Sequence, residues 1–203
     1  STNEVTLTSY AYDRAGGDTN GDGSSSGSPG DWYGIVILDS GTGDFDHAIV
    51  RYGGYGEGIS SYGGLQLQNY AEATIDHSLF TDNEVGGVAV NGNATTATIQ
   101  HSEFSYNGAG ISSVNSTLTI ENNTNVHDNS EDGLFINESD WTGAAPSITH
   151  SSFEDNGRYG VNLWVDSSTL PVGHYNNIDG NGSLQLNTLE NLTGSDGTDN
   201  YWG

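Results

Sequence analysis

The sequence predicts an all-β protein, a right-handed parallel β-helix of about seven to eight rungs. Three observations support this prediction. The first is a repeat whose length varies between 22 and 30 residues, and the second is a short apolar strand, usually beginning with glycine, in most repeats. A third is that no helical i, i+3, i+4 pattern runs long enough to compete. A single solenoid domain is expected over residues 1–203, with a loop inserted at residues 13–33.

The repeat contains an apolar residue, then His or Asn two positions on, then a second apolar residue, and usually Asn three positions after that. The second apolar residues are expected to anchor the interior, one per rung. Successive anchors lie 30, 24, 22, 27 and 25 residues apart. They are Val50, Phe80, Phe104, Val126, Phe153 and Ile178.

Short apolar strands separate these segments, and most begin with Gly. When these strands are included, each rung is expected to supply one strand to each of three parallel sheets, with apolar residues stacked from rung to rung. They are expected at residues 34–37, 64–67, 87–90, 110–113, 133–136, 160–163 and 183–186.

Two polar columns follow from the alignment. The first allows two interpretations: an imidazole ladder that binds metal, or an inward turn ladder that hydrogen-bonds the backbone. We favour the second, because stacked rungs rarely converge tetrahedrally and Asn fits a turn as well as His. The second column, of asparagines, is expected to be a structural ladder. The first column is His47, His77, His101, Asn122, His150 and His174; the second is Asn83, Asn107, Asn129, Asn156 and Asn181.

Several stretches resemble secreted bacterial and archaeal proteins with pectin-lyase-like parallel β-helix repeats. They are "GGDTNGDGSSSGSPGDWYGI", "AIVRYGGYGEG", "GGLQLQNYAEATIDHSLFTDN" and the closing "NYWG". The resemblance covers nearly the whole chain and implies the fold and an extracellular or cell-surface location. It does not choose a function, because the same solenoid carries lyases, hydrolases, epimerases, adhesins and structural proteins.

The charge balance is extreme, with 27 acidic residues against 3 Arg and no Lys, for a net charge of −24. Binding to nucleic acid or anionic membranes depends on Lys and Arg, so neither partner is expected. No stretch approaches the apolar length of a transmembrane helix. Such a surface also repels itself unless salt or divalent cations screen it, which suggests adaptation to high salt.

The stretch "DTNGDG" within the inserted loop matches the first half of an EF-hand-type calcium loop. Alternate oxygen ligands would come from Asp18, Asn20 and Asp22, while Pro29 stands where the bidentate Glu is expected. We expect a structural calcium ion here, with Asp31 or backbone carbonyls completing the shell and Trp32 holding the loop end against the coil.

Catalytic chemistry is the weaker interpretation, and no catalytic residue is assigned. Asp128 and Asp155 would lie one strand spacing apart on adjacent rungs, as a glycosidase pair could, but we favour a solvated acidic edge, because a repeating turn position explains them without catalysis. The resemblance to lyases implies a Lys or Arg base, and Arg158 beside Tyr159 and Trp164 is the most site-like neighbourhood. These three residues are candidate glycan contacts.

Sequons supply a further surface pattern. Asn93, Asn115 and Asn137 each follow an apolar strand at intervals of 22 residues, so three acceptors are expected in one exposed turn column. Asn191 is a fourth candidate. Asn122 and Asn181 are expected to be unavailable inside the inward ladders.

Two functional hypotheses remain open. The first is a non-enzymatic, glycosylated surface module that is structural or adhesive and assembles end to end into fibres or joins flanking domains. The second is a carbohydrate-active enzyme or glycan-binding module acting on a polysaccharide.

Overall fold

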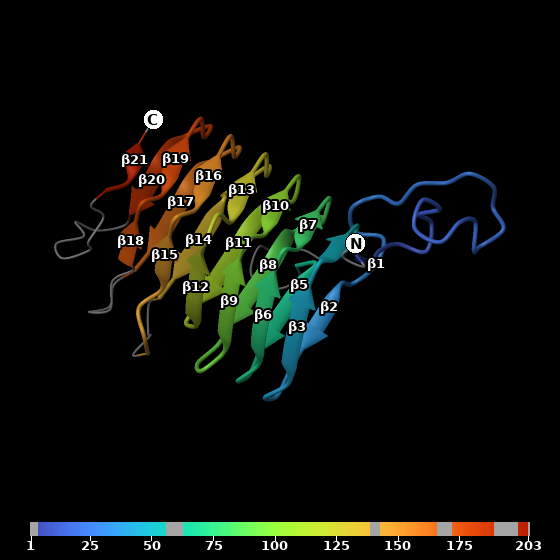
Figure 1. Ribbon diagram of the computed structural model, residues 1–203, viewed down its shortest axis with the longest axis horizontal. Coiled ribbons are helices and arrows are strands. Elements are labelled where there is room, and N and C mark those ends of the chain that lie inside the picture. Colours follow the sequence, from blue (N-terminus) through green and yellow to red (C-terminus); the bar gives the residue numbers. More distant parts are fainter. Residues whose placement is uncertain (1–3, 56–62, 139–142, 166–171, 189–198, 203) are drawn as a thin grey trace.

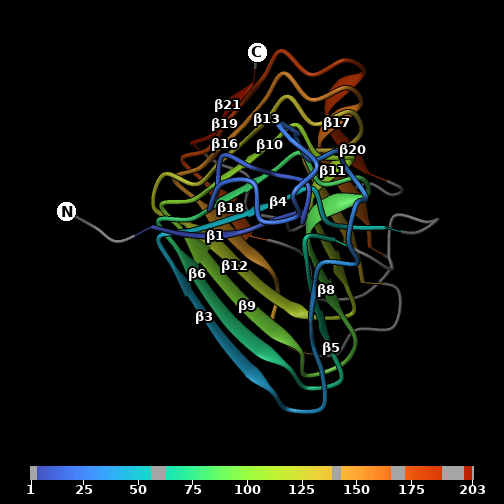
Figure 2. The same cartoon turned by 90° about the vertical axis from the view of Figure 1, so that its right-hand side faces the viewer.

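The computed structural model describes residues 4–55, 63–138, 143–165, 172–188 and 199–202. Its strands form three parallel sheets that coil into a right-handed β-helix, which confirms the predicted fold (Figure 1). Viewed along the coil, the three sheets enclose a single interior (Figure 2). No helix long and apolar enough to span a membrane occurs in this part of the chain.

Sheet A contains eight strands and sheet B seven. Sheet A consists of β1 (Val5–Leu7), β4 (Ala48–Arg51), β7 (Leu79–Thr81), β10 (Glu103–Ser105), β13 (Asn125–His127), β16 (Ser152–Glu154), β19 (Asn177–Asp179) and β21 (Tyr201–Trp202). Sheet B consists of β2 (Ile35–Ile37), β5 (Leu65–Gln68), β8 (Gly86–Asn91), β11 (Ala109–Val114), β14 (Leu134–Asn137), β17 (Tyr159–Trp164) and β20 (Leu184–Thr188).

Sheet C contains six strands, so at most six complete three-strand rungs are present among the described residues, slightly fewer than predicted. The prediction counted every apolar strand as a full rung, whereas the outermost strands belong to partial ones. Sheet C consists of β3 (Thr42–Asp46), β6 (Glu72–Asp76), β9 (Thr96–Gln100), β12 (Thr117–Glu121), β15 (Ser147–Thr149) and β18 (Val172–His174).

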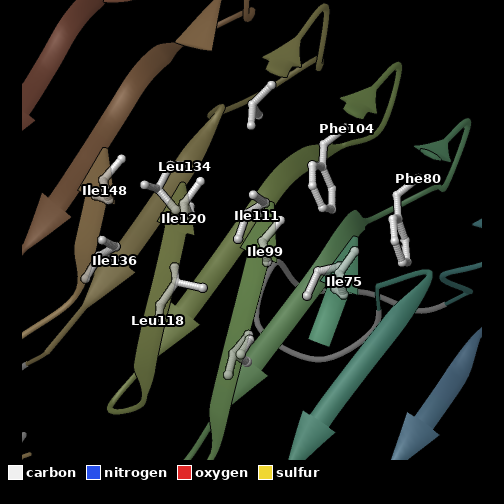
Figure 3. Close-up of a cluster of buried hydrophobic side chains, with 14 of the residues drawn as sticks. Ile75, Phe80, Ile99, Phe104, Ile111, Leu118, Ile120, Leu134, Ile136 and Ile148 are labelled. Atoms are coloured by element: carbon white, nitrogen blue, oxygen red, sulfur yellow. The ribbon is translucent and has the colours of Figure 1, made fainter. Parts of the chain in front are cut away.

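The interior is a set of apolar columns, as the repeat predicts. Every predicted anchor is buried, and equivalent anchors pair in register, as Phe80 does with Phe104 and Phe104 with Val126. The rings of Phe80 and Phe104 stack with centroids 5.2 Å apart in sheet A, and aliphatic residues such as Ile99 and Ile120 form a separate column in sheet C (Figure 3).

The asparagine column is a buried hydrogen-bonded ladder, as predicted. In the middle rung, Asn129 Oδ1 accepts from Asn107 N at 3.0 Å and from Asn107 Nδ2 at 3.1 Å. Asn129 Nδ2 in turn donates to Phe104 O at 3.0 Å and to Asn156 Oδ1 at 2.9 Å. The ladder therefore satisfies, inside the coil, the backbone groups that each corner removes from the sheets.

Glycines at or near the start of the sheet B strands make room for this ladder. A Cβ atom at Gly133 would lie 2.6 Å from Asn156 Nδ2 and 2.7 Å from the carbonyl oxygen of Gly160. Glycine is required here by close approach, because φ is not positive at this position.

A long connection between β1 and β2 extends beyond the coil (Figure 1). The end of this connection nearest β2 is held against the coil, as predicted. Trp32 packs against the core and donates a hydrogen bond from Nε1 to the carbonyl oxygen of Arg51 at 2.9 Å. The Arg51 guanidinium also bonds the hydroxyl groups of Tyr12 and Tyr52 and pairs with Asp82 at 2.7 Å. Arg51 thus joins the connection to the first rungs.

Candidate functional site

Two columns of residues with left-handed backbone form the corners of sheet A. The corner from sheet C to sheet A includes His47, His77, His101, Asn122 and His150, with φ between 45° and 54°. The corner from sheet A to sheet B includes Tyr52, Asp82, Tyr106, Asp128 and Asp155, with φ between 52° and 64°. Asn, Asp and His are the side chains that best tolerate this conformation outside glycine, which explains much of both columns.

The structure corrects the expected direction of the histidine column, because its side chains lie outside the coil. The side chains of His47, His77 and His101 are 29%, 49% and 39% exposed. The left-handed residue turns the chain so that the following positions point inward instead. A buried column of Ser, Thr and Asn fills those positions: Ser78, Ser102, Thr124, Ser151 and Asn176. The sequence signal for this column is a small or amide side chain one or two residues after each corner.

Outside the coil, the imidazoles stack on one another beside carboxylates. His47 and His77 are nearly parallel with centroids 5.0 Å apart, and His77 and His101 follow at 4.8 Å. Asp46 Oδ1 lies 2.6 Å from His47 Nδ1. Asp76 Oδ1 lies 2.8 Å from His77 Nδ1 and 3.0 Å from His101 Nδ1.

Asp76 is held between three side chains. Its second oxygen accepts a hydrogen bond from Gln100 Nε2 at 3.1 Å. Burial raises the pKa of the Asp76 carboxyl, but the hydrogen bonds from His101 and Gln100 and the charges of both imidazoles outweigh it, so the pKa is lowered overall. This carboxylate stays ionised and able to accept.

The candidate calcium loop brings together a partly different set of ligands. Carboxylate oxygens of Asp13, Asp18 and Asp22 lie within 4.8 Å of one another, and Asp13 Oδ1 is buried without a hydrogen bond. Asn20 adjoins this group by donating to Asp22 at 2.8 Å. Asp31 is not in this group of carboxylates. Its Oδ2 accepts hydrogen bonds from the Ser9 hydroxyl at 2.6 Å and from the Ser28 amide at 2.8 Å, and so joins the two ends of the loop.

The acidic residues at the corner from sheet A to sheet B, Asp128 and Asp155, make different contacts. Asp128 contacts His127 at 2.8 Å, and His127 also approaches Glu103 at 3.3 Å. Asp155 lies against Gly180, where an added Cβ atom would meet its carboxylate. This arrangement fits a solvated acidic edge at a repeated turn position.

The neighbourhood of Arg158 divides into two places. The guanidinium lies 5.2 Å from the ring centroid of Tyr159 and within 3.8 Å of Glu131 and 3.7 Å of Asp132. Trp164 is at the opposite end of β17 and meets Phe135 edge to face at 5.4 Å. The two aromatic residues are therefore about 16 Å apart along an extended strand, and Arg158 lies at one end beside acidic residues.

The sequons Asn93 and Asn115 follow strands β8 and β11 of sheet B, whereas Asn137 is the last residue of β14. The three sequons are not aligned with one another. Val114 pairs with both Asn91 and Asn137, so Asn115 lies one position and Asn93 two positions beyond the level of Asn137. Asn93 is exposed, whereas Asn115 and Asn137 are half-buried. Asn181 is buried as expected, but Asn122 is exposed, so burial does not block it. Asn191 lies outside the described residues.

Sequence reasoning missed a shallow hollow of about 400 Å³ on sheet A. His150 and Tyr175 stack across its edge with centroids 4.9 Å apart. Asn125 Oδ1 and Ser152 Oγ line it as buried oxygen atoms without a hydrogen-bond partner. The hollow thus combines an aromatic surface with uncharged polar groups.

Sequence reasoning also missed Glu138, which follows β14 and has a fully buried side chain. Burial raises the pKa of its carboxyl to about 7, despite bonds from the Ser116 backbone and the Ser113 hydroxyl. Glu138 Oε2 has no hydrogen-bond partner. The sequence shows only an acidic residue inside a sequon, which usually indicates the surface.

Comparison with known proteins agrees with this architecture. No curated protein and no solved structure gave a significant match to the chain. A family model described as a right-handed β-helix region matches residues 24–191. This match spans more than half of the 203 residues and includes the repeats that form the three sheets. The chain therefore belongs to the right-handed β-helix family.

Proposed function

We propose that this protein is a structural or adhesive β-helix module of the cell surface or extracellular space, and that it stacks end to end. The observation that carries the proposal is the set of strand edges at the two ends of the described coil. Among the described strands, β1, β2 and β3 are the outermost strands at one end, and β18, β20 and β21 at the other. Unpaired strand edges are templates for pairing with another chain.

The distribution of apolar surface supports the same proposal. The exposed aliphatic side chains in the described residues belong to the outer rungs: Val5, Val36 and Leu38 at one end, Val172 and Leu184 at the other. In the middle rungs the described aliphatic side chains are buried or half-buried. Stacking two copies would pair the edges and cover these side chains.

Net charge sets the conditions for stacking. At −24, two copies repel each other unless ions screen them, so assembly should need salt or divalent cations. A calcium ion bound by Asp18, Asn20 and Asp22 remains a prediction, supported by the three clustered carboxylates, with Asp13 in place of Asp31. It would order the connection that adjoins the first rungs.

The proposal is tested by negative-stain electron microscopy and light scattering of the purified protein. We expect rods longer than one molecule in high salt with calcium, and shorter ones after chelation. Asp18→Asn combined with Asp22→Asn should reproduce the chelated state in calcium. Single particles under all conditions would overturn end-to-end stacking.

A matched pair of variants locates the contact. Val36→Lys adds a charge to the outward face of the outermost strand β2 and should prevent rods. Thr74→Lys adds the same charge to an exposed position in β6, which is not an outermost strand, and should leave the rods intact. Equal effects of both variants would indicate a response to charge alone.

The hollow on sheet A favours a second candidate function, the binding of a neutral glycan. Tyr175 offers an exposed ring for stacking, while the exposed side-chain amide of Asn123 offers a donor and an acceptor for sugar hydroxyls. The lining includes no acidic residue, so a neutral sugar avoids the repulsion that a polyuronate would meet elsewhere on this surface.

Binding of neutral gluco-, xylo- and manno-oligosaccharides, measured by calorimetry, tests this candidate. We expect Tyr175→Asn to weaken binding at least tenfold. Tyr106→Asn is the matched control, because both tyrosines are exposed and have φ of 56°. Absence of binding to the whole panel, or an equal loss in both variants, would remove the candidate.

A further inference from the structure

The outer corner of the second and third rungs brings two histidines onto one carboxylate oxygen. Asp76 ends β6, and His77 is the left-handed residue that follows it. His101 occupies the equivalent corner one rung later and is brought alongside by the pairing of β6 with β9. Both imidazoles direct Nδ1 at Asp76 Oδ1, at 2.8 and 3.0 Å.

These separations are close to those of a metal coordination shell. Ligands at about 2.0–2.1 Å from a tetrahedral zinc ion are about 3.3 Å from each other. On metal binding, the Nδ1 protons that now face Asp76 would pass to solvent, and the two N–O distances would widen by a few tenths of an ångström. The ligand atoms of the three residues already lie within 4.8 Å of one another. The exposed side chains can make this adjustment.

The surroundings are also those of a metal site. Gln100 Nε2 donates to the second oxygen of Asp76 at 3.1 Å and fixes the orientation of the carboxylate. On the other side, the His47 ring stacks on His77 at 5.0 Å. Solvent reaches the exposed histidines, so water can complete the shell.

We propose that Asp76, His77 and His101 bind a divalent transition-metal ion, with zinc as the best match. Two imidazoles and one carboxylate suit zinc, copper or nickel, whereas calcium and magnesium prefer oxygen ligands. The site joins two consecutive rungs on their outer face. It is independent of the proposed stacking, because it lies on the side of the coil and not at its ends.

Calorimetric titration of metal-free protein with zinc tests the proposal. The titration is run in excess calcium, so that acidic side chains are occupied. We expect one zinc ion per chain, and at least a tenfold loss of affinity in His77→Asn, His101→Asn and Asp76→Asn. Cobalt should show the intense visible absorption of tetrahedral coordination in the wild type and lose it in these variants.

The column supplies its own control. Asn122 occupies the same corner with φ of 54°, so asparagine is compatible with this backbone and the variants should fold. His150→Asn removes an exposed imidazole of the same column that stacks on Tyr175, and it should leave zinc affinity unchanged. Zinc binding that survives His77→Asn combined with His101→Asn, or that falls equally in His150→Asn, would overturn the site.

Discussion

Replacing Asn129 with alanine is expected to lower the free energy of unfolding by about 4 kcal/mol. Asn129 lies in the middle of the buried ladder and bonds both neighbouring rungs. Without its side chain, Asn107 N and Phe104 O lose their ladder partners inside the coil, where water cannot replace them. Each buried polar group left unpaired costs about 1–3 kcal/mol, and the lost volume adds to this.

Urea unfolding followed by circular dichroism measures this effect. Asn93→Ala is the control, because Asn93 is exposed and outside the ladder; its stability should change by less than about 0.5 kcal/mol. If Asn129→Ala lost less than about 1 kcal/mol, the ladder would not be the stabilising element that its hydrogen bonds indicate.

Glu138→Gln is expected to stabilise the protein at alkaline pH and to have little effect near pH 4. Burial raises the pKa of Glu138 to about 7, so the folded state holds this proton more tightly than the unfolded chain does. The wild type therefore keeps this contribution below the unfolded pKa of about 4.5 and loses it as pH rises through about 7. The loss amounts to about 3 kcal/mol.

The informative quantity is the difference in unfolding free energy between Glu138→Gln and the wild type, measured from pH 4 to pH 9. The difference should grow with pH, because glutamine stays neutral while the buried carboxyl must ionise. Glu72→Gln removes one negative charge at an exposed position and controls for the net charge of −24. A difference that is constant with pH would show that Glu138 keeps an ordinary pKa.

The repeat in the sequence was sufficient to predict the interior. Anchors such as Phe80 and Phe104 recur at a period that only stacked rungs can satisfy, and all of them are buried. The asparagine ladder was predictable for the same reason, because an amide recurs three residues after five of the six anchors and an amide can both donate and accept. Periodicity identifies residues that coincide on successive rungs, whatever their detailed geometry.

Periodicity could not determine which side of the wall a column faces. His77 and Asn83 recur equally well, yet His77 lies outside the coil and Asn83 inside. The backbone decides this: a single left-handed residue at each corner changes the direction of the side chains that follow. A sequence shows that His and Asn tolerate such a corner but not which way the chain turns there.

The repeat is therefore enough to predict the solenoid, its anchors and its amide ladder, and the composition predicts its acidic surface. Only the tertiary structure placed two imidazoles on Asp76, moved Asp13 beside Asp18 and Asp22, and buried Glu138. The repeat fixes the order of residues along each rung, because every rung must match its neighbours. Contacts between side chains of different rungs depend on corner geometry and strand register, which arise only when the rungs are stacked.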